Sequence, residues 1–289
     1  MRILLVNINF HQKNCHAILN YKNVQVVSIY DIHQLGHIKL SEFDCVFSPS
    51  IPIDISKYPN TKFFFGPHFS IFPENSLTLI KGGNSAYNLL SDWVKNIWTQ
   101  NYPICNGLKI VTCPFGVDTD RFTEIKPLSE RNEIMVYCKS RSPQDLSFIQ
   151  TFLNNNHKKY RLFSYQTRYN ESEYISCLQN SRFCIWIDAH ESQGFALQEA
   201  LSCNVPLFVW NISSMADEYN SSYPRHFAAT TTPYWDERCG EQFYTVNEFD
   251  SKFKLFLSKL DTYKPREYIL DNLSFAKCEE RFIQVVNNI

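Results

Sequence analysis

Short apolar runs alternate with amphipathic stretches along the first part of the chain. The runs are aliphatic or aromatic, have the length of buried strands, and several end at turn residues such as Gly-Pro. Over 85–100, apolar residues recur at helical spacing with polar residues between them, which predicts an amphipathic helix. The predicted strands cover 2–8, 24–30, 43–48, 61–67 and 107–116. This alternation predicts a parallel α/β sheet.

A second series of strand-like and helix-like segments follows, with clearer boundaries. The predicted strands cover 132–140, 160–165, 182–189 and 205–210, and the predicted helices cover 143–156, 170–181, 195–204, 248–261 and 273–289. The polar stretch 118–132 contains a proline and separates the two series. The pattern therefore predicts two Rossmann-like domains, at 1–122 and 123–270, and a C-terminal helix at 271–289.

Length and charge narrow the classes of function. The chain has 289 residues, enough for one large domain or two of about 120–150 residues. Its 44% hydrophobic and 20% charged residues are ordinary for a globular protein that buries a core. A net charge of −1 and the lack of a dense Lys/Arg run argue against a nucleic-acid partner, because phosphate neutralisation needs a basic surplus.

The cysteines and the apolar runs indicate a compartment. None of the 10 cysteines forms a CxxC pair, and several stand in apolar runs, which is typical of buried reduced thiols rather than disulfides or zinc ligands. The N-terminal run lacks the features of a signal peptide. No segment approaches about 18 uninterrupted apolar residues, so we expect no transmembrane segment. These features predict a cytoplasmic protein, with peripheral membrane contact left open.

The segment 188–210 (DAHESQGFALQEALSCNVPLFVW) carries the sharpest chemical signal. Glu191 and Glu199 lie eight residues apart, and Gly194 stands at the strand-to-helix turn between them. Backbone N–H groups near Gly194 can receive phosphate oxygens at a helix N-terminus, and ligands of open α/β sheets bind beyond the strand ends. The carboxylates can accept hydrogen bonds from sugar hydroxyls. The alternative interpretation makes Glu191 a helix-cap acid and Glu199 a solvated helix residue.

This segment resembles the E-x7-E region of glycosyltransferase family 4 and related retaining GT-B enzymes. The stretch 114–122 (PFGVDTDRF) resembles the P-x-G-V-D-x-x-x-F stretch that those enzymes carry between their domains. The resemblance implies a GT-B fold, with two Rossmann-like domains whose parallel sheets face each other across a cleft and a C-terminal helix that crosses back to the first domain. It implies a glycosyltransferase of glycan biosynthesis that moves a sugar, with retention, from a UDP- or GDP-linked donor to a hydroxyl of a glycan or other glycoconjugate. It implies no cofactor and no metal.

The resemblance also assigns roles to individual residues. Glu191 would contact the transferred sugar and Glu199 the ribose. Lys139 and Arg141 fit the basic pair that neutralises the diphosphate, although the same two residues could be ordinary surface cations. His68 would be the first-domain histidine near the sugar, with a structural histidine as the alternative. The turn over the sugar and diphosphate would comprise Ser192, Gln193, Gly194 and Phe195.

Other positions depart from the family or carry weaker signals. The stretch after the first predicted strand, VNINFHQKN, holds no glycine where GT-B enzymes commonly have a Gly-Gly turn. Asp118 and Asp120 form a D-x-D, which holds a divalent metal in GT-A enzymes. We prefer a structural turn there, because Asp118 matches the fixed Asp of the interdomain stretch. Tyr165 and Gln166 follow a predicted strand and could meet the nucleobase. The loop 234–243 could close over the nucleotide or be a plain surface loop.

Two other classes of function stay open. One is an inverting GT-B transferase, such as the exostosin type, or a nucleotide-sugar epimerase, which would turn over its donor without an acceptor. The other is a non-catalytic GT-B relic that binds a nucleotide sugar without consuming it. The paired glutamates and the basic pair weigh mildly against the relic.

Overall fold

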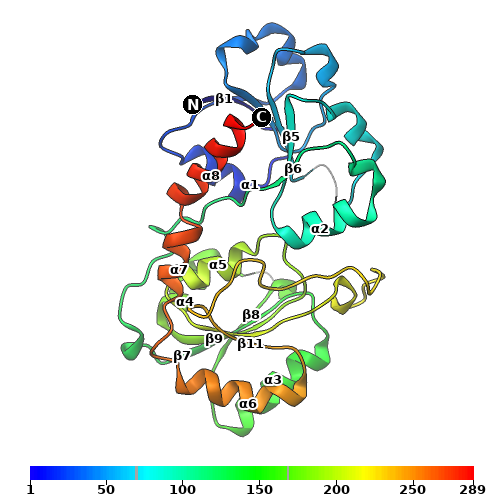
Figure 1. The fold of residues 1–289 in the computed structure, drawn as a ribbon. Helices are drawn as coiled ribbons and strands as arrows, with labels where there is room; N and C mark the ends of the chain where they lie inside the picture. Colours follow the sequence, from blue (N-terminus) through cyan, green and yellow to red (C-terminus); the bar gives the residue numbers. More distant parts are fainter. Residues whose placement is uncertain (69–70, 168) are drawn as a thin grey trace. The chain divides into compact units, whose positions relative to one another are not determined.

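The computed structural model describes residues 1–68, 71–167 and 169–289, which form two compact units. Unit 1 comprises Met1–Gly116 together with Leu273–Ile289, and unit 2 comprises Val117–Asn272 (Figure 1). The stretch 117–122 packs within unit 2, where Arg266 donates to the backbone carbonyls of Thr119 and Phe122 at 3.1 Å each. The part of PFGVDTDRF after Gly116 thus belongs to the second unit.

Unit 1 is built on a six-stranded, all-parallel sheet in the order β2-β1-β3-β4-β5-β6. The strands are β1 Arg2–Val6, β2 Gln25–Ile29, β3 Cys45–Ser48, β4 Phe63–Phe65, β5 Ser85–Leu89 and β6 Ile110–Thr112. Every residue of β3, β4 and β5 is buried. Continuous burial is expected of a parallel sheet that is covered on both faces, so these strands show apolar runs rather than alternation.

The helix predicted over 85–100 is wrong in its first part. Residues Ser85–Leu89 form β5, and helix α2 begins only at Asp92. The polar side chains of β5 bond to backbone rather than to solvent: Ser85 Oγ donates to the Ile80 carbonyl, and the Asn88 amide bonds to both the N–H and the C=O of Cys113. A strand with internally satisfied Ser and Asn has the same polarity pattern as an amphipathic helix.

The C-terminal helix α8 (Phe275–Asn287) belongs to unit 1, where it lies beside α1 (Gln12–Leu19) in Figure 1. The Phe282 ring packs against Phe47 of β3 and Phe64 of β4, at centroid distances of 5.7 and 5.6 Å. Glu279 accepts hydrogen bonds from the backbone and side chain of Asn23. The predicted return of this helix to the first domain is confirmed. Unit 1 also contains α2 (Asp92–Asn101) and the short 3₁₀ helices Ile32–His37, Leu40–Glu42, Ile55–Lys57, Asn75–Ile80 and Pro103–Cys105.

Unit 2 is built on a five-stranded parallel sheet in the order β11-β10-β9-β7-β8. The strands are β7 Glu133–Cys138, β8 Arg161–Ser164, β9 Ser181–Ile187, β10 Leu207–Trp210 and β11 Gly240–Phe243. The helices are α3 Pro143–Asn155, α4 Glu171–Asn180, α5 Phe195–Ser202, α6 Val246–Ser258 and α7 Pro265–Asn272, with 3₁₀ helices Leu128–Glu130, Tyr165–Thr167 and Met215–Asp217.

The stretch predicted as a loop at 234–243 contains a strand that the sequence pattern did not reveal. Residues Gly240–Phe243 form β11 at the sheet edge. A Cβ on Gly240 would lie 1.9 Å from the Leu207 carbonyl oxygen, so only glycine lets β11 approach β10 here. With four residues, two of them polar, β11 is too short and too polar to stand out as a strand.

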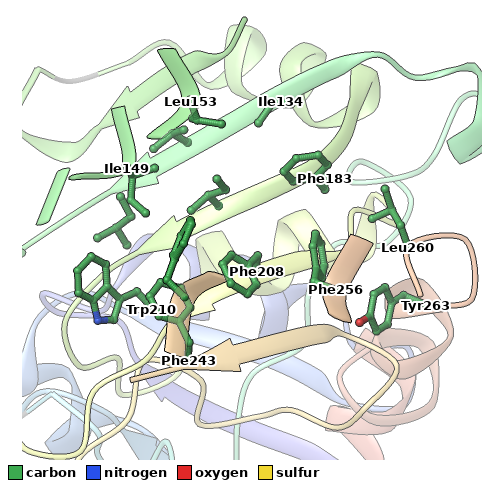
Figure 2. Close-up of a cluster of buried hydrophobic side chains, with 14 residues drawn as sticks. Ile134, Ile149, Leu153, Phe183, Phe208, Trp210, Phe243, Phe256, Leu260 and Tyr263 are labelled. Carbon is green, nitrogen blue, oxygen red and sulfur yellow. The ribbon is translucent and has the colours of Figure 1, made fainter. Parts of the chain in front are cut away.

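Helices cover both faces of the unit 2 sheet. Figure 2 shows the core on one face, where Ile149 and Leu153 of α3 and Phe256 of α6 meet Phe208 and Phe243 of the sheet. On the other face, the Tyr137 and Trp186 rings stack at 3.9 Å, and Tyr174 of α4 packs against Tyr137. The predicted architecture, two α/β domains with parallel sheets, is confirmed.

The two sheets share one strand order, which locates the candidate site. In each unit the first strand lies between the second and the third: β1 between β2 and β3, and β7 between β8 and β9. The connection that follows the first strand therefore runs to one side of it, and the connection that follows the second strand runs to the other side. Ligands of open α/β sheets bind outside the carboxyl ends of the strands at such a switch point.

Candidate functional site

The carboxyl edge of unit 2 brings Lys139 and Glu191 together. Cys138, the last residue of β7, is in register with Ile187, the last residue of β9, so the segments that follow leave the sheet side by side. The Lys139 Nζ donates a hydrogen bond to the Glu191 Oε1. Burial by itself would lower the pKa of Lys139, but the neighbouring carboxyls of Asp188 and Glu191 outweigh it and raise that pKa. Lys139 is thus a firmly charged ammonium at the switch point.

A tight turn carries the chain from Glu191 into α5. Gly194 adopts a φ of +81°, the left-handed region that favours glycine. Inside the turn Gln198 Nε2 donates to the Gln193 carbonyl at 2.6 Å, and Gln193 Nε2 donates to Gln198 Oε1 at 3.2 Å. The Glu191 N–H donates to the Thr230 carbonyl at 3.1 Å. The backbone of the turn is therefore fixed on both sides. Among the other predicted turn residues, Ser192 is exposed and Phe195 half-buried.

Glu199 lies on the buried side of α5, with 3% exposure, among tyrosines. Burial and then the charge of Glu199 raise the pKa of Tyr174. Burial also raises the pKa of Tyr169, and the Glu199 charge adds to that rise. The Tyr174 hydroxyl donates to the Ala196 carbonyl at 2.7 Å. The alternative that made Glu199 a solvated helix residue is wrong.

Arg141 follows Lys139 by two residues and has a different set of partners. Its side chain is 7% exposed, its Nε donates to Asp145 Oδ2 at 2.9 Å, and its guanidinium stands 4.9 Å from the Trp210 ring centroid. Its Nη1 also donates to the carbonyls of Asp188 and Trp210. The alternative of a surface cation is wrong for Arg141, because these bonds join the ends of β7, β9 and β10. The Lys139 side chain is more accessible, with 25% exposure against 7% for Arg141.

The segment after β8 places an aromatic ring beside Lys139. Tyr165 is 62% exposed, and Lys139 Nζ stands 5.3 Å from its ring centroid. Gln166 lies in the same 3₁₀ turn, Tyr165–Thr167, and its side chain is outside the described part of the chain.

Several residues that build the edge were absent from the sequence prediction. Asp188 directly follows β9 and is 1% exposed. Asn211, after β10, accepts hydrogen bonds from the Ile212 and Thr231 N–H groups at 2.8 Å each and from Thr230 Oγ1 at 3.0 Å. Thr231 Oγ1 in turn donates to the Asp188 carbonyl at 3.3 Å. Their position in the sequence could have revealed these residues, because each of them directly follows or faces the end of a buried parallel strand.

The corresponding edge of unit 1 holds His68, whose surroundings favour the neutral imidazole. Asn14 Nδ2 lies 2.8 Å from His68 Nε2, and the His68 ring contacts those of Phe10 and His11 at 6.3 and 5.7 Å. Burial and the His11 charge lower the pKa of His68 to about 4. Asn9, after β1, takes a φ of +53° where a glycine turn was expected. An asparagine tolerates this conformation, so the turn forms without Gly.

Asp118 closes a turn in unit 2. Its Oδ1 accepts the Arg121 N–H at 3.0 Å, and its carbonyl accepts the Phe122 N–H at 2.9 Å. Over residues 1–68, 71–167 and 169–289, no group of three or more His, Cys, Asp or Glu side chains is arranged to hold a metal ion. Over the same ranges no helix has the length and hydropathy of a membrane span.

Comparison with known proteins identifies the fold. No known family profile matches the sequence, and no curated protein matches it. Among solved structures, a sucrose-phosphate synthase from Thermosynechococcus elongatus is similar with a TM-score of 0.61 at 9% identity, over 99% of this chain and 98% of that one. The trehalose-6-phosphate phosphatase N-terminal domain of Candida albicans gives 0.59 at 11%, over 99% and 97%. The catalytic domain of starch synthase IV from Arabidopsis thaliana, bound to ADP and acarbose, gives 0.50 at 9%, over 85% and 72%.

These likenesses define the class of fold. The chain has the GT-B type of architecture, two Rossmann-like parallel-sheet domains, as the two synthases have. Identities of 9–11% show the fold and leave the reaction to be argued from the site.

Proposed function

We propose that the protein is a glycosyltransferase that moves a sugar from a nucleoside-diphosphate sugar to an acceptor hydroxyl on a glycan or other glycoconjugate. One observation carries the proposal: the Lys139–Glu191 ion pair stands at the switch point of unit 2, directly before the Gly194 turn into α5. A diphosphate and a sugar need a cation, a carboxylate and a helix N-terminus in close succession, and this edge supplies all three.

The residues divide the donor between them. Lys139 binds the diphosphate, and Glu191 accepts hydrogen bonds from sugar hydroxyls once the diphosphate has taken over the ammonium. Glu199 holds the ribose, and Ser192, Gln193, Gly194 and Phe195 form the turn over the sugar and diphosphate. Tyr165, with Gln166 beside it, offers an exposed ring for the base at 5.3 Å from Lys139. His68 serves the sugar side as a neutral imidazole, and Arg141 supports the site by holding the strand ends.

The reaction breaks the bond between the anomeric carbon and the phosphate oxygen and forms a bond from that carbon to the acceptor oxygen. The acceptor proton passes to the departing diphosphate, so the atoms balance without a cofactor or metal. Lys139 lowers the barrier by stabilising the negative charge that develops on the departing phosphate. Retention of configuration rests on the E-x7-E resemblance of Glu191 and Glu199. UDP and GDP are the nucleotides we expect.

The free thiols support the proposed location. All ten cysteines are free and nine are buried. Burial raises the pKa of Cys45, Cys203 and Cys278 to about 12, which keeps these thiols protonated and unreactive. We propose the cytoplasm, where such thiols stay reduced, as the site of glycan synthesis by this protein, with peripheral membrane contact left open.

A donor panel tests the proposed function. Purified protein is screened for thermal stabilisation by UDP, GDP, dTDP and CMP sugars, and the products are followed by NMR with and without glycan acceptors. We expect stabilisation by a UDP or GDP sugar, and a product whose anomeric configuration is that of the donor. Glu191→Gln should keep nucleotide binding and lose turnover, while the exposed Glu173→Gln serves as the matched control. No stabilisation by any nucleotide contradicts the proposal.

The same panel separates the other classes. An epimerase gives a new nucleotide sugar without acceptor, and an inverting transferase gives the opposite anomer. A binding relic gives stabilisation without any product.

A further inference from the structure

The carboxyl groups of the unit 2 edge outnumber the cations that pair with them. Arg141 is committed to Asp145 at 2.9 Å, and Lys139 is committed to Glu191. Asp188 is 1% exposed, and it shares the Lys139 charge with Glu191, which accepts the hydrogen bond of the ammonium. A buried, ionised carboxylate without a full set of partners is costly, and the usual resolution is that the group stays protonated.

The hydrogen bonds of Asp188 show which atom carries the proton. Oδ1 accepts the Ala189 N–H at 2.7 Å. Oδ2 is buried and meets no N–H or O–H donor from the part of the chain that the structure describes. What interacts with the Asp188 carboxyl instead is the Glu191 carboxylate, which is itself only an acceptor. Two acceptors in contact require a proton between them.

We propose that Asp188 keeps its proton in the folded protein and donates a hydrogen bond from Oδ2 to the Glu191 carboxylate, which makes Asp188 the positioning residue for Glu191. Burial first, and then the Glu191 charge, raises the pKa of Asp188 well above its ordinary value, in agreement with this geometry. Five titratable groups of the described chain that interact with Asp188 come from two places. Lys139, Tyr137, Cys138 and Arg141 lie in β7 or just after it, and Glu191 lies in the turn after β9.

The protonation of Asp188 does not depend on the proposed function, but its effect on donor binding rests on that function. When a diphosphate draws the Lys139 ammonium away, the Asp188 hydrogen bond still holds Glu191 in place for the sugar. A neutral Asp188 also spares the incoming diphosphate a second negative charge beside Lys139.

Infrared difference spectroscopy of the free protein tests the protonation directly. At pH 7 we expect the C=O stretch of a protonated carboxylic acid, shifted in D2O, in the wild type and its loss in Asp188→Asn. Glu191→Gln should keep the band and shift its frequency, because the Asp188 hydrogen bond then goes to a neutral amide oxygen rather than to a carboxylate. The control Glu279→Gln changes a carboxylate that is 5% exposed in unit 1 and bonded to Asn23, and should keep the band. A wild-type spectrum without the Asp188 band overturns the proposal.

The positioning role has its own readout. Asp188→Asn replaces the O–H with an N–H donor and should keep kcat near the wild-type value. Asp188→Ala, which removes the donor without adding volume, should lower kcat about tenfold or more while the Kd for the nucleoside diphosphate stays close to that of the wild type. Equal kcat values for the two variants overturn the positioning role. If no nucleotide sugar is turned over at all, the infrared result still decides the protonation, so failure of the proposed function is recognised separately.

Discussion

The two units share a strand order but have unlike carboxyl edges. In unit 2 the switch point between β7 and β9 carries a cation and two carboxyls, Lys139, Asp188 and Glu191. In unit 1 the switch point between β1 and β3 opens next to His68 and His11, whose pKa values burial lowers. The same topology thus provides a charged edge suited to a diphosphate and a neutral edge suited to hydroxyls and ring faces. Topology fixes where a ligand can bind in each unit, and the residues after each strand decide which chemical groups that edge can accept.

The sharpest way to break this division is to neutralise the charged edge. Lys139→Met keeps most of the side-chain length and removes the charge, leaving Glu191 and Asp188 without a cation. We expect kcat/KM to fall by roughly 10²–10³-fold, which is the usual cost of losing one group that stabilises transition-state charge. Steady-state kinetics on the donor found by the panel measures it. The exposed Lys158→Met is the control, and an equally large loss in His68→Gln would contradict the division.

The second prediction concerns the glycine that shapes the neutral edge. A Cβ on Gly66 would lie 2.5 Å from the Asn88 carbonyl oxygen and 2.9 Å from the Tyr87 ring, at a φ of +78°. Gly66→Ala should therefore lower the free energy of unfolding by about 3 kcal/mol, from overpacking together with left-handed strain. Urea denaturation measures this change. Gly36→Ala, with open space around the added carbon, should be nearly neutral, and a similar loss in both variants would refute the packing argument.

The third prediction uses pH to probe the neutral edge. The pKa of His68 is about 4 in the folded protein, below the ordinary histidine value of 6.5. Below pH 6.5 the unfolded chain binds a proton that the folded protein refuses, so stability falls as the pH drops from about 6.5 to 4 and levels off below. With allowance for partial exposure, His68 should account for roughly 2 kcal/mol of this loss.

The measurement is the unfolding free energy across this pH range. His68→Gln should reduce the fall in unfolding free energy between pH 6.5 and 4 relative to the wild type. The exposed His33→Gln is the control and should show the same fall as the wild type. An equally steep fall that persists in His68→Gln would mean that His68 is protonated in the folded protein, and the neutral edge would lose its main support.

The predictable part of the site is the part that local sequence determines. Glu191, Gly194 and Glu199 lie within nine residues of one strand-turn-helix segment, and Lys139 directly follows a buried strand. The carboxyl ends of parallel strands share an edge, so these residues meet without any knowledge of distant contacts. Their arrangement follows from the strand pattern.

The unpredicted part depends on partners that are distant in sequence. Arg141 pairs with Asp145 one helical turn on, which the sequence shows, but it also lies over Trp210, which only the fold reveals. The raised pKa of Asp188 comes from its burial and from the Glu191 charge, and neither can be deduced from the position of Asp188 in the sequence. The strands β5 and β11 were missed for a similar reason, since Asn88 and Gly240 are explained by Cys113 and Leu207 across the sheet.

The smallest expected effect comes from Gly194, and it separates conformation from packing. Its φ is +81°, as left-handed as that of Gly66, yet an added Cβ would meet Glu191 Cβ and Cγ at 3.5 and 3.8 Å and Leu197 Cβ at 3.9 Å, all ordinary contacts. Gly194→Ala should thus cost about 1 kcal/mol of strain alone, and Gly194→Asn less, because asparagine tolerates this conformation. Gly83→Ala, with open space around the added carbon, is the matched control. Because the Gly194 turn leads from Glu191 into α5, Gly194→Ala should also displace Glu191. We therefore expect kcat to fall in this variant even though the folded protein loses little stability. A loss of stability as large as that of Gly66→Ala would instead mean that Gly194 is required for close packing. The turns at the charged edge and at the neutral edge would then need glycine for the same reason.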